Sequence, residues 1–349
     1  MQAVVLVGGE GTRLRPLTYA VPKPMAPLLG RPFIGWIIER LRAAGVVEVI
    51  LSCCYLPEAI ESYFGDGRDF GVDLHYVFEE EPLGTAGAVK NAVHKVSGTT
   101  YVCNGDILTG VDLVALREAH ARTHAIATIH TRAVEDPSQF GVVETDTNGR
   151  VLRFVEKPQP GETSAIDINA GTYVLEPEAL DAIPPERKVS IERETFPKLI
   201  SETERVFAVS TNDYWIDVGR PSTYIQAHRD ILDSAFERPL GEEIAKGIWS
   251  ADGTPIPRGV DVIGPVYLGA GVRIEAGTTI GPYAVLYEGC RVSAGAHVSS
   301  SIIWPECFIG HGASVRDAIL GLEVVVEPGA AVEPGSVLGR DERVHARTP

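Results

Sequence analysis

Cysteine is scarce in this chain of 349 residues. There are five, an odd number, and two of them, Cys53 and Cys54, are adjacent within an expected strand. This pattern is neither a disulfide framework nor the spacing of metal ligands. It is typical of a reducing compartment, so we expect the protein to be cytoplasmic.

Long apolar runs are also lacking. No stretch approaches the run of about eighteen apolar residues that a membrane-spanning helix needs, and the N-terminus leads straight into an expected strand rather than a signal peptide. Positive charge is in deficit, with 31 Lys and Arg against 47 Asp and Glu, and the net charge is −16. We therefore expect no membrane partner and no nucleic-acid partner.

Lysine is scarce, with seven in the whole chain. Two of them, Lys23 in "PKP" and Lys157 in "EKP", lie in proline-bounded loops next to expected strands. A lysine that only solvates the surface is more usual on a helix. These two positions therefore favour a role in binding an anion.

Residues 1–232 alternate between strand and helix periods. Strands are expected at 2–7, 47–54, 73–79, 100–104, 125–132, 140–145, 151–156, 168–175 and 205–209. Helices are expected at 33–44, 57–64, 84–96, 112–123, 176–183, 190–201 and 221–232. Because helices separate the first five strands, we expect a Rossmann-like α/β fold, a mainly parallel sheet with helices on both faces. Ligands of such sheets bind at the carboxyl ends of the strands.

The rest of the chain has a six-residue period. Apolar residues recur at 262, 268, 274, 280, 286, 292 and 298, and then, after one-residue slips near Trp304 and Gly321, at 309, 315, 326, 332 and 338. Such hexads predict a left-handed parallel β-helix. The domains expected are an α/β domain at 1–232, a linker at 233–258, a β-helix domain at 259–338 and a tail at 339–349.

The stretch "VLVGGEGTRLRPLTYAVPKPM" at 5–25 follows the first expected strand with three glycines, Gly8, Gly9 and Gly11. Glycines at such a turn expose backbone N–H groups, which suit a phosphate. The spacing is neither a Walker motif nor a clean dinucleotide fingerprint. Arg13 and Lys23 lie ten residues apart in a long loop, so the stretch favours a triphosphate held at more than one point.

Two carboxylates follow strands elsewhere in the chain. Asp106 in "VCNGDIL" comes just after a buried strand, and Asp217 in "YWIDVG" follows a short apolar strand and precedes a helix. Mg²⁺ prefers one or two carboxylates together with phosphate oxygens and water, so the pair suggests one Mg²⁺. Taken singly, Asp106 could be a turn residue and Asp217 a helix cap.

Three further stretches carry candidate binding residues. In "EPLGTAG", Gly84 and Thr85 would offer backbone groups to a base, although an ordinary helix start gives the same pattern. In "FVEKPQPG", Glu156 and Lys157 suit a sugar hydroxyl and a phosphate, or form a surface ion pair of little energetic weight. Gly141 and Gly171 would allow close approach of a ligand, although both could be turn glycines.

The ordered motifs "GGEGTRLRPLT…PKP", "EPLGTAG", "NGD", "FGVV", "EKP", "INAGTYVL" and "WIDVG" resemble the sugar-1-phosphate nucleotidylyltransferase family. The resemblance runs from residue 2 to about 232, which marks 1–232 as the catalytic domain, and the hexapeptide region matches the C-terminal β-helix frequent in the family. Within the family, "GTAG" is most similar to the guanylyl type, which uses GTP and mannose 1-phosphate and releases pyrophosphate.

The resemblance implies roles for individual residues. Those implied for the nucleotide are Leu6, Gly8, Gly9, Gly11, Thr12, Arg13, Lys23, Gly84 and Thr85. Those implied for the sugar phosphate are Gly141, Glu156, Lys157, Asn169 and Gly171. Arg13, Lys23 and Lys157 are the implied catalytic residues, and Asp106 and Asp217 are implied to hold Mg²⁺.

Three alternatives stay open. The substrates could be dTTP and glucose 1-phosphate, although thymidylyltransferases tend to have Gly-Leu-Ala where this chain has Gly-Thr-Ala. The β-helix could be an acyltransferase using His297 or His311, which we expect at solvent-facing turns. The chain could also be a non-catalytic sensor, but such a paralogue is expected to have lost Arg13, Lys23 or an aspartate.

The β-helix has no evident chemistry, and its apolar faces must be covered. We expect the phase slips to bulge a coil and to leave Trp304 as an exposed anchor. A homo-oligomer, dimer or tetramer, through this domain is therefore expected. A chain ending near residue 235 is expected to keep the complete active site and to lose assembly.

Overall fold

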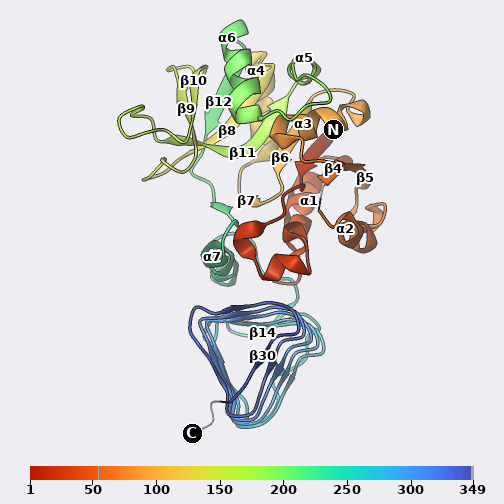
Figure 1. The fold of residues 1–349 in the computed structure, drawn as a ribbon, viewed down its shortest axis with the longest axis vertical. Helices are drawn as coiled ribbons and strands as arrows, with labels where there is room; N and C mark the ends of the chain where they lie inside the picture. Colours follow the sequence, from red (N-terminus) through yellow and green to blue (C-terminus); the bar gives the residue numbers. More distant parts are fainter. Residues whose placement is uncertain (54, 347–349) are drawn as a thin grey trace. The chain divides into compact units, whose positions relative to one another are not determined.

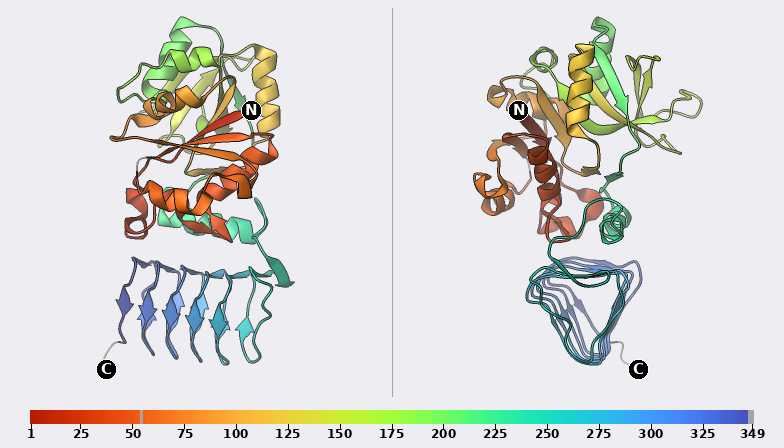
Figure 2. Two further views of the ribbon diagram at one scale, coloured as in Figure 1. Left: turned by 90° about the vertical axis from the view of Figure 1, so that its right-hand side faces the viewer. Right: turned by 180° about the vertical axis from the view of Figure 1, so that it is seen from behind.

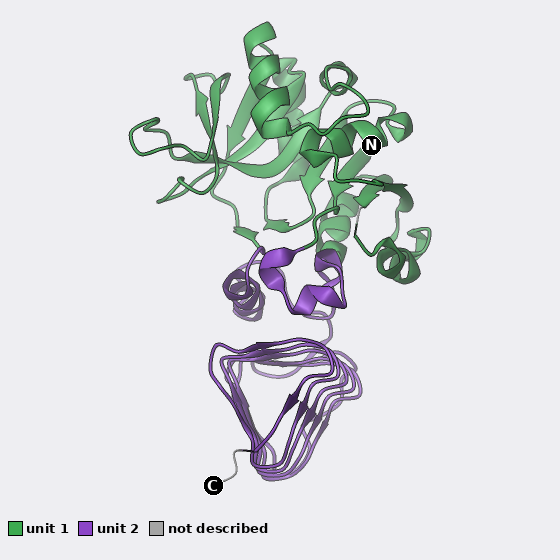
Figure 3. Ribbon diagram, viewed as in Figure 1, with its two compact units in different colours: residues 1–10, 34–217 green, residues 11–33, 218–349 purple. Residues whose placement is uncertain are grey.

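The computed structural model of the protein describes residues 1–53 and 55–346, so Cys54, which was expected in a strand, lies outside the described residues. The chain forms two compact units (Figure 3). Unit 1 comprises residues 1–10 and 34–217, and unit 2 comprises residues 11–33 and 218–349. Within the described part of the chain, no helix is both long and apolar enough to cross a membrane.

Unit 1 is built on a nine-stranded sheet with the order β10-β9-β11-β6-β1-β4-β5, which β8 joins through β11 and β12 joins through β8 (Figure 1). Its strands are β1 (Gln2–Leu6), β4 (Glu48–Cys53), β5 (Asp73–Phe78), β6 (Thr100–Asn104), β8 (Ala127–Ala133), β9 (Gly141–Thr145), β10 (Val151–Glu156), β11 (Asp167–Leu175) and β12 (Val206–Ser210). The neighbours β5, β4, β1 and β6 are parallel, whereas β11 pairs antiparallel with both β6 and β8. The expected mainly parallel, Rossmann-like sheet is confirmed.

Helices cover both faces of this sheet. They are α1 (Phe33–Ala43), α2 (Pro57–Phe64), α3 (Gly84–Ala92), α4 (Leu113–Thr123), α5 (Pro177–Asp181) and α6 (Phe196–Glu202). Side chains alternate along β1: Val4 packs in the core that includes residues of α3 and α6, and Ala3 and Val5 are fully buried on the opposite face. Burial on both faces explains why the strand is apolar throughout.

Unit 2 contains a three-sided parallel β-helix, seen with its coils stacked in Figure 2. Its first side is formed by β14 (Glu242–Ala245), β15 (Ile248–Ser250), β17 (Val266–Leu268), β20 (Ala284–Leu286), β23 (Ile302–Ile303), β26 (Ile319–Leu320) and β29 (Val337–Leu338). The second is formed by β16 (Asp261–Val262), β19 (Thr279–Ile280), β22 (His297–Ser299), β25 (Ser314–Arg316) and β28 (Ala331–Val332). The third is formed by β18 (Arg273–Ile274), β21 (Arg291–Val292), β24 (Phe308–Ile309), β27 (Val325–Val326) and β30 (Arg343–Val344).

The phase slips in the hexads shorten two coils and do not bulge them. Val285 pairs with Ile302 and Ile302 with Ile319, a spacing of 17 residues, where Val266 and Ala284 are spaced by 18. The ladder remains in register through both short coils. The expectation of bulged coils was wrong, because each short coil has one residue fewer at a corner between strands and the strand pairs are unaffected.

The β-helix sheets extend beyond the expected 259–338. Strands β14 and β15 lie in the segment expected as a linker, and β15 pairs in parallel with β17. At the other end, β30 lies in the expected tail and pairs with β27. β15 has Ser250 at the position where the hexad would place an apolar residue, whereas Val344 of β30 continues the period six residues after Leu338 and packs against the β-helix core.

The remaining elements of unit 2 come from two distant parts of the chain. Residues 11–33 form three 3₁₀ turns, η1 (Thr12–Leu14), η2 (Leu17–Tyr19) and η3 (Lys23–Met25), and the short strands β2 (Pro27–Leu28) and β3 (Arg31–Pro32). Helix α7 (Pro221–Leu232) precedes the β-helix. Trp304, expected as an exposed anchor, is 1% exposed, and its indole Nε1 donates to the hydroxyl of Tyr224 at 3.1 Å. That expectation was wrong, because α7 covers the indole.

Candidate active site

The loops that follow β1 and β6 leave the sheet of unit 1 side by side. Leu6, the last residue of β1, pairs with Asn104, and the N–H of Gly105 donates to the carbonyl of Leu6 at 2.9 Å. A Cβ at Gly105 would lie 2.5 Å from that oxygen, so the close approach requires glycine. Gly8 and Gly9 therefore begin their loop next to the loop that carries Asp106. Asn104 and Gly105 of the "NGD" motif were assigned no role from the sequence.

Asp106 and Asp217 are brought together by a small two-stranded sheet. Strands β7 (Ile107–Thr109) and β13 (Trp215–Asp217) are antiparallel, and Asp217 pairs with Ile107. Asp106 directly precedes Ile107, so its backbone lies next to that of Asp217 on the other strand. Trp215 secures β13 to the main sheet, because its Nε1 donates to the carbonyl of Ala170 at 3.0 Å.

This pair of carboxylates fits a hard divalent cation. Among the residues that the structure describes, no group of three or more His, Cys, Asp and Glu is arranged to hold a metal. Both aspartates are half-buried. Two carboxylates, with the other ligands coming from phosphates and water, are the donor set that Mg²⁺ prefers.

Gly141 and Glu156 lie on the neighbouring strands β9 and β10 of unit 1, and Lys157 directly follows β10. Glu156 pairs with Gly141 across β9 and β10, and a Cβ at Gly141 would lie 2.9 Å from a carboxylate oxygen of Glu156. The backbone N–H of Lys157 donates to the carbonyl of Phe140 at 2.9 Å. Burial raises the pKa of the Glu156 carboxyl, and Glu192 raises it further, whereas Lys157 opposes the shift.

Asn169 and Gly171 form a bulge in β11. The register of β11 against β8 shifts between Asn169 and Tyr173. The Asn169 side chain accepts from the N–H of Gly171 at 3.0 Å and donates to the hydroxyl of Tyr173 at 2.8 Å. Gly171 has a φ of 72°, and a Cβ there would lie 2.4 Å from Ile107 and 2.7 Å from Asn104. The bulge thus packs directly under the loop that carries Asp106.

Gly84 begins α3 with a φ of 73°, and a Cβ there would lie 2.7 Å from the carbonyl of Val189. The hydroxyl of Thr85 donates to Glu192 at 2.7 Å and accepts from the N–H of Ile191 at 2.8 Å. These bonds tie the start of α3 to the π-helical turn η6 (Ile191–Thr195). The Thr85 side chain therefore connects α3 to η6. Neither interpretation from the sequence, a helix start or a contact with the base, predicts Glu192 as its partner.

Glu79, which precedes the "EPLGTAG" stretch, was assigned no role from the sequence. Glu79 is 8% exposed. Its carboxylate accepts from the hydroxyl of Ser52 at 3.0 Å and from the N–H of Leu83 at 2.9 Å. It therefore holds the turn before Gly84 against β4. Its position next to the apolar end of a strand was the available signal.

Gly11, Thr12, Arg13 and Lys23 belong to unit 2. Gly11 has a φ of 62°, and a Cβ there would lie 2.9 Å from the Cβ of Lys23. The hydroxyl of Thr18 donates to the carbonyl of Gly11 at 3.0 Å. Gly11 and Lys23, twelve residues apart in the sequence, are therefore in contact in the fold. Lys23 is 8% exposed, whereas Arg13 is exposed.

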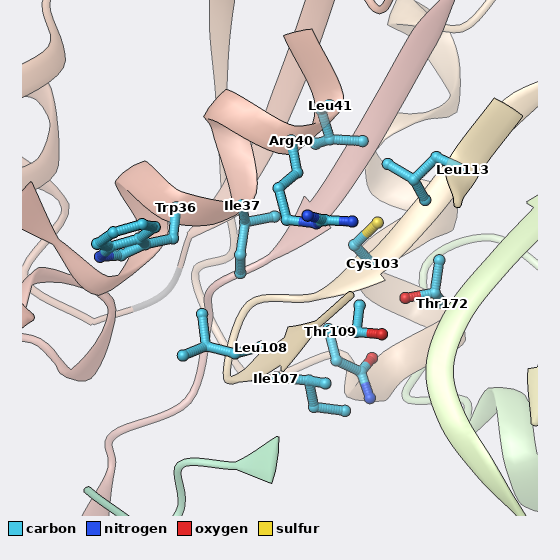
Figure 4. A pocket seen from close by; sticks show the side chains of 11 residues that line it. Trp36, Ile37, Arg40, Leu41, Cys103, Ile107, Leu108, Thr109, Leu113 and Thr172 are labelled. Carbon is cyan, nitrogen blue, oxygen red and sulfur yellow. The ribbon is translucent and has the colours of Figure 1, made fainter. Parts of the chain in front are cut away.

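A small cavity of about 20 Å³ lies behind β6 and β7 in unit 1, and Figure 4 shows Cys103, Ile107 and Leu108 among its lining side chains. This volume holds about one water molecule and no substrate. Burial raises the pKa of the Cys103 thiol to about 12, which keeps it protonated. Cys103 is therefore no nucleophile, and the cavity is part of the packing beneath the candidate site.

The two histidines considered for acyl transfer are both exposed on the β-helix. His297 lies in strand β22, and not at a turn as expected, with Thr279 and Ser314 as its strand partners. His311 follows β24. Exposed imidazoles on an uncovered side of the β-helix give no support to the acyltransferase alternative.

Comparisons with known proteins agree with these features. Residues 2–234 match the family described as Nucleotidyl transferase, and residues 262–348 match the GMPPB C-terminal domain. A mannose-1-phosphate guanylyltransferase of Mycobacterium tuberculosis is 40% identical over 302 residues, which cover 84% of this chain and 82% of that protein. A UTP–glucose-1-phosphate uridylyltransferase of Synechocystis is 35% identical over 89% of this chain and 84% of that protein.

A solved structure, HddC from Yersinia pseudotuberculosis complexed with GMP-PN, is 30% identical, with a TM-score of 0.56 over 66% of this chain and 98% of HddC. The family match spans well over half of the chain, and it covers every motif on which the resemblance rested. The chain therefore belongs to the nucleotidyl transferase family.

Proposed function

We propose that the protein is a mannose-1-phosphate guanylyltransferase, which transfers the guanylyl group of GTP to mannose 1-phosphate and releases pyrophosphate. The observation that carries the proposal is the pairing of β7 with β13, which joins Asp106 and Asp217 at the edge of unit 1 where the Gly8–Gly9 loop begins. The relative from Mycobacterium tuberculosis supports the choice of substrates.

The reaction needs charge and alignment more than it needs a base. A phosphate oxygen of the sugar 1-phosphate, already ionised at neutral pH, attacks the α-phosphorus of the NTP, and pyrophosphate leaves from the opposite side. Both reactants are anions, so the protein must hold them in line against their repulsion. In this proposal Lys157 orients the attacking phosphate, and Arg13 and Lys23 bind the polyphosphate.

Asp106 and Asp217 are the residues that would hold Mg²⁺. When bound there, the ion supplies positive charge to the α-phosphoryl group and to the leaving pyrophosphate. The backbone N–H groups of Gly8, Gly9, Gly11 and Thr12 act as phosphate donors in this proposal. Their accessibility depends on glycines that keep side chains out of the loop.

The remaining proposed contacts divide between the base and the sugar. Leu6, Gly84 and Thr85 belong to the base side, where Thr85 acts through the backbone because its hydroxyl is bonded to Glu192. Gly141, Glu156, Asn169 and Gly171 belong to the sugar side. Asn169 and Gly171 act mainly by shaping the bulge of β11, since the Asn169 amide is bonded within it.

A second candidate keeps the reaction and changes the substrates. The uridylyltransferase of Synechocystis, 35% identical over 89% of this chain, favours glucose 1-phosphate with UTP. The thymidylyltransferase alternative, dTTP with glucose 1-phosphate, has support only at the level of the fold.

Assembly and location complete the proposal. We propose a homo-oligomer that uses the second and third sides of the β-helix; Phe308, on the third side, is an exposed aromatic residue. A cytoplasmic location is supported by the thiols, since Cys103, Cys290 and Cys307 are free and buried.

The test is a pyrophosphate-release assay with five NTPs against mannose 1-phosphate and glucose 1-phosphate, with Mg²⁺. We expect kcat/KM for GTP with mannose 1-phosphate to exceed the other combinations by about tenfold or more. Chelation of the metal should abolish release, and added Mg²⁺ should restore it. A preference for UTP or dTTP with glucose 1-phosphate would overturn the substrate assignment and promote the second candidate.

A further inference from the structure

One side of the β-helix is apolar on its outer face. Side chains alternate along each short strand: Val266 and Leu268 point into the β-helix core, so Tyr267 between them points outward. The outward residues on this side are Tyr267, Val285, Ile302 and Ile319, none more than 2% exposed. On the other two sides the equivalent positions include Asp261, His297, Arg273, Arg291 and Arg343, all exposed.

Other segments of unit 2 cover this apolar side. They are α7 and the end of the loop that carries Gly11, Arg13 and Lys23, all coloured as one unit in Figure 3. A Cβ at Gly30 would lie 2.9 Å from the Tyr267 hydroxyl, and a Cβ at Gly339 would lie 3.1 Å from Pro16. The β-helix therefore touches the loop near both of its ends.

A buried chain of hydrogen bonds fixes one of these contacts. The backbone N–H of Leu29 donates to the Tyr287 hydroxyl at 2.8 Å. That hydroxyl lies 2.8 Å from Nε2 of His228, whose Nδ1 lies 2.8 Å from the carbonyl of Tyr224. For a neutral His228 only one assignment satisfies all of them: Nδ1 donates to the carbonyl of Tyr224, and Nε2 accepts from the Tyr287 hydroxyl. Burial lowers the pKa of His228 to about 4, which agrees with the neutral form.

A second buried connection runs in parallel with the first. The Trp304 indole donates to the Tyr224 hydroxyl, and that hydroxyl donates to the carbonyl of Pro27. Pro27 and Leu29 flank the end of strand β2, four and six residues after Lys23. Between them and Lys23 the chain is tightly turned, since the N–H of Ala26 donates to the carbonyl of Lys23 at 3.0 Å. A displacement at Pro27 or Leu29 is therefore passed to Lys23.

We propose that Tyr287, His228, Tyr224 and Trp304 are positioning residues for the nucleotide, through which the β-helix sets the conformation of the loop at residues 11–33. The inference rests on the proposed function, in which Arg13 and Lys23 bind the polyphosphate. It extends that function by making the C-terminal repeat domain part of the nucleotide-binding apparatus. This positioning should affect the KM for the NTP. It should have little effect on the KM for the sugar 1-phosphate, whose proposed contacts belong to unit 1.

The first test is Tyr287→Phe, which keeps the ring and removes the partner of the Leu29 N–H. The matched control is Tyr283→Phe, the same change at a β-helix tyrosine whose hydroxyl lies 3.1 Å from both carboxylate oxygens of Asp233. With the substrate pair that the wild type prefers, we expect Tyr287→Phe to raise the KM for NTP about fivefold or more. The KM for the sugar 1-phosphate should change less than about twofold, and Tyr283→Phe should resemble the wild type. Equal changes in both KM values, or no change, would overturn the proposal.

Hydrogen exchange of backbone amides supplies a readout that needs no turnover. In Tyr287→Phe the amides of residues 11–29 should exchange at least about fivefold faster than in the wild type, and in Tyr283→Phe they should not. Unchanged exchange overturns the proposal. Faster exchange in a protein that turns over no NTP supports the positioning role and counts against the proposed function. If Tyr287→Phe does not fold, Trp304→Phe, which removes the donor to Tyr224, is judged by the same two measurements.

Discussion

Asp106 and Asp217 owe their pairing to a strand register that spans more than a hundred residues of sequence. Each follows an apolar strand, so each could be identified singly as a loop carboxylate. Half-buried carboxylates at neighbouring positions repel one another, and a divalent cation between them removes that repulsion. The first prediction concerns these two side chains.

We expect Asp106→Asn and Asp217→Asn each to lower kcat by at least about a hundredfold at saturating Mg²⁺, because a metal-borne charge effect is worth several kcal/mol. The melting temperature should change little, since Asn preserves the shape of the side chain. Asp112→Asn is the control: Asp112 caps α4 by accepting from Val114 and Ala115, and Asn caps equally well. Near-normal kcat in either variant would assign that aspartate a structural role.

Other single residues show where sequence reasoning reaches its limit. Gly11 and Lys23 were both expected at the nucleotide, and their direct contact follows from 3₁₀ turns too short to have a period. Thr85 and Glu192 are bonded across 107 residues, and nothing local to either residue indicates this. The residue types of the candidate site were therefore predictable, whereas their contacts and hydrogen bonds with distant segments were not.

At the scale of elements, periodicity predicted both folds because alternation and the hexad are local properties of the chain. The antiparallel insertion of β11 between β6 and β8 depends on long-range pairing, and the pattern of β11 alone could not predict it. The sequence also did not predict that one side of the β-helix is covered. The outward residues of that side are apolar, but the segments that cover it, residues 11–33 and α7, lie elsewhere in the chain. This cover leaves two sides available to a second copy of the chain.

Assembly is predicted to use those two sides. Phe308 is 36% exposed on the third side and pairs with Arg291 and Val325 on adjacent strands. Light scattering should give the full chain the mass of a dimer or tetramer, and Phe308→Glu should shift that mass towards the monomer. Leu152→Glu, at a residue 52% exposed on β10, should leave it unchanged.

A monomeric wild type, or a Phe308→Glu protein with unchanged mass, would contradict this assembly. A chain ending near residue 235 is not a clean test. It removes Tyr287 and Trp304, so it uncovers the loop at residues 11–33 as well as the β-helix contacts. Such a chain would keep every candidate site residue by sequence, but it would lose the contacts that Tyr287 and Trp304 make with residues 27–29 and α7.

At the scale of the whole molecule, each unit contains a histidine held neutral by burial. Burial lowers the pKa of His228 in unit 2 and of His130 in unit 1 to about 4. His130 is 1% exposed, and its Nε2 lies 2.9 Å from the hydroxyl of Thr211. An unfolded histidine titrates near its ordinary pKa of about 6.5. Between these two pKa values each imidazole binds a proton only after its unit unfolds.

Acidification should therefore destabilise both units before the carboxylates titrate. Because the unfolded state binds the extra protons, the free energy of unfolding is at its full value above about pH 6.5 and falls as the pH is lowered towards 4. In the limit, each histidine changes the free energy of unfolding by about 1.4 kcal/mol per pH unit. The free energy of unfolding, measured with urea at several pH values between about 6.5 and 5, should fall less steeply with decreasing pH in His228→Gln and in His130→Gln than in the wild type. His297→Gln, at an exposed histidine, should show the same pH dependence as the wild type. Identical slopes in all four proteins would mean that neither buried imidazole takes up its proton on unfolding in this range.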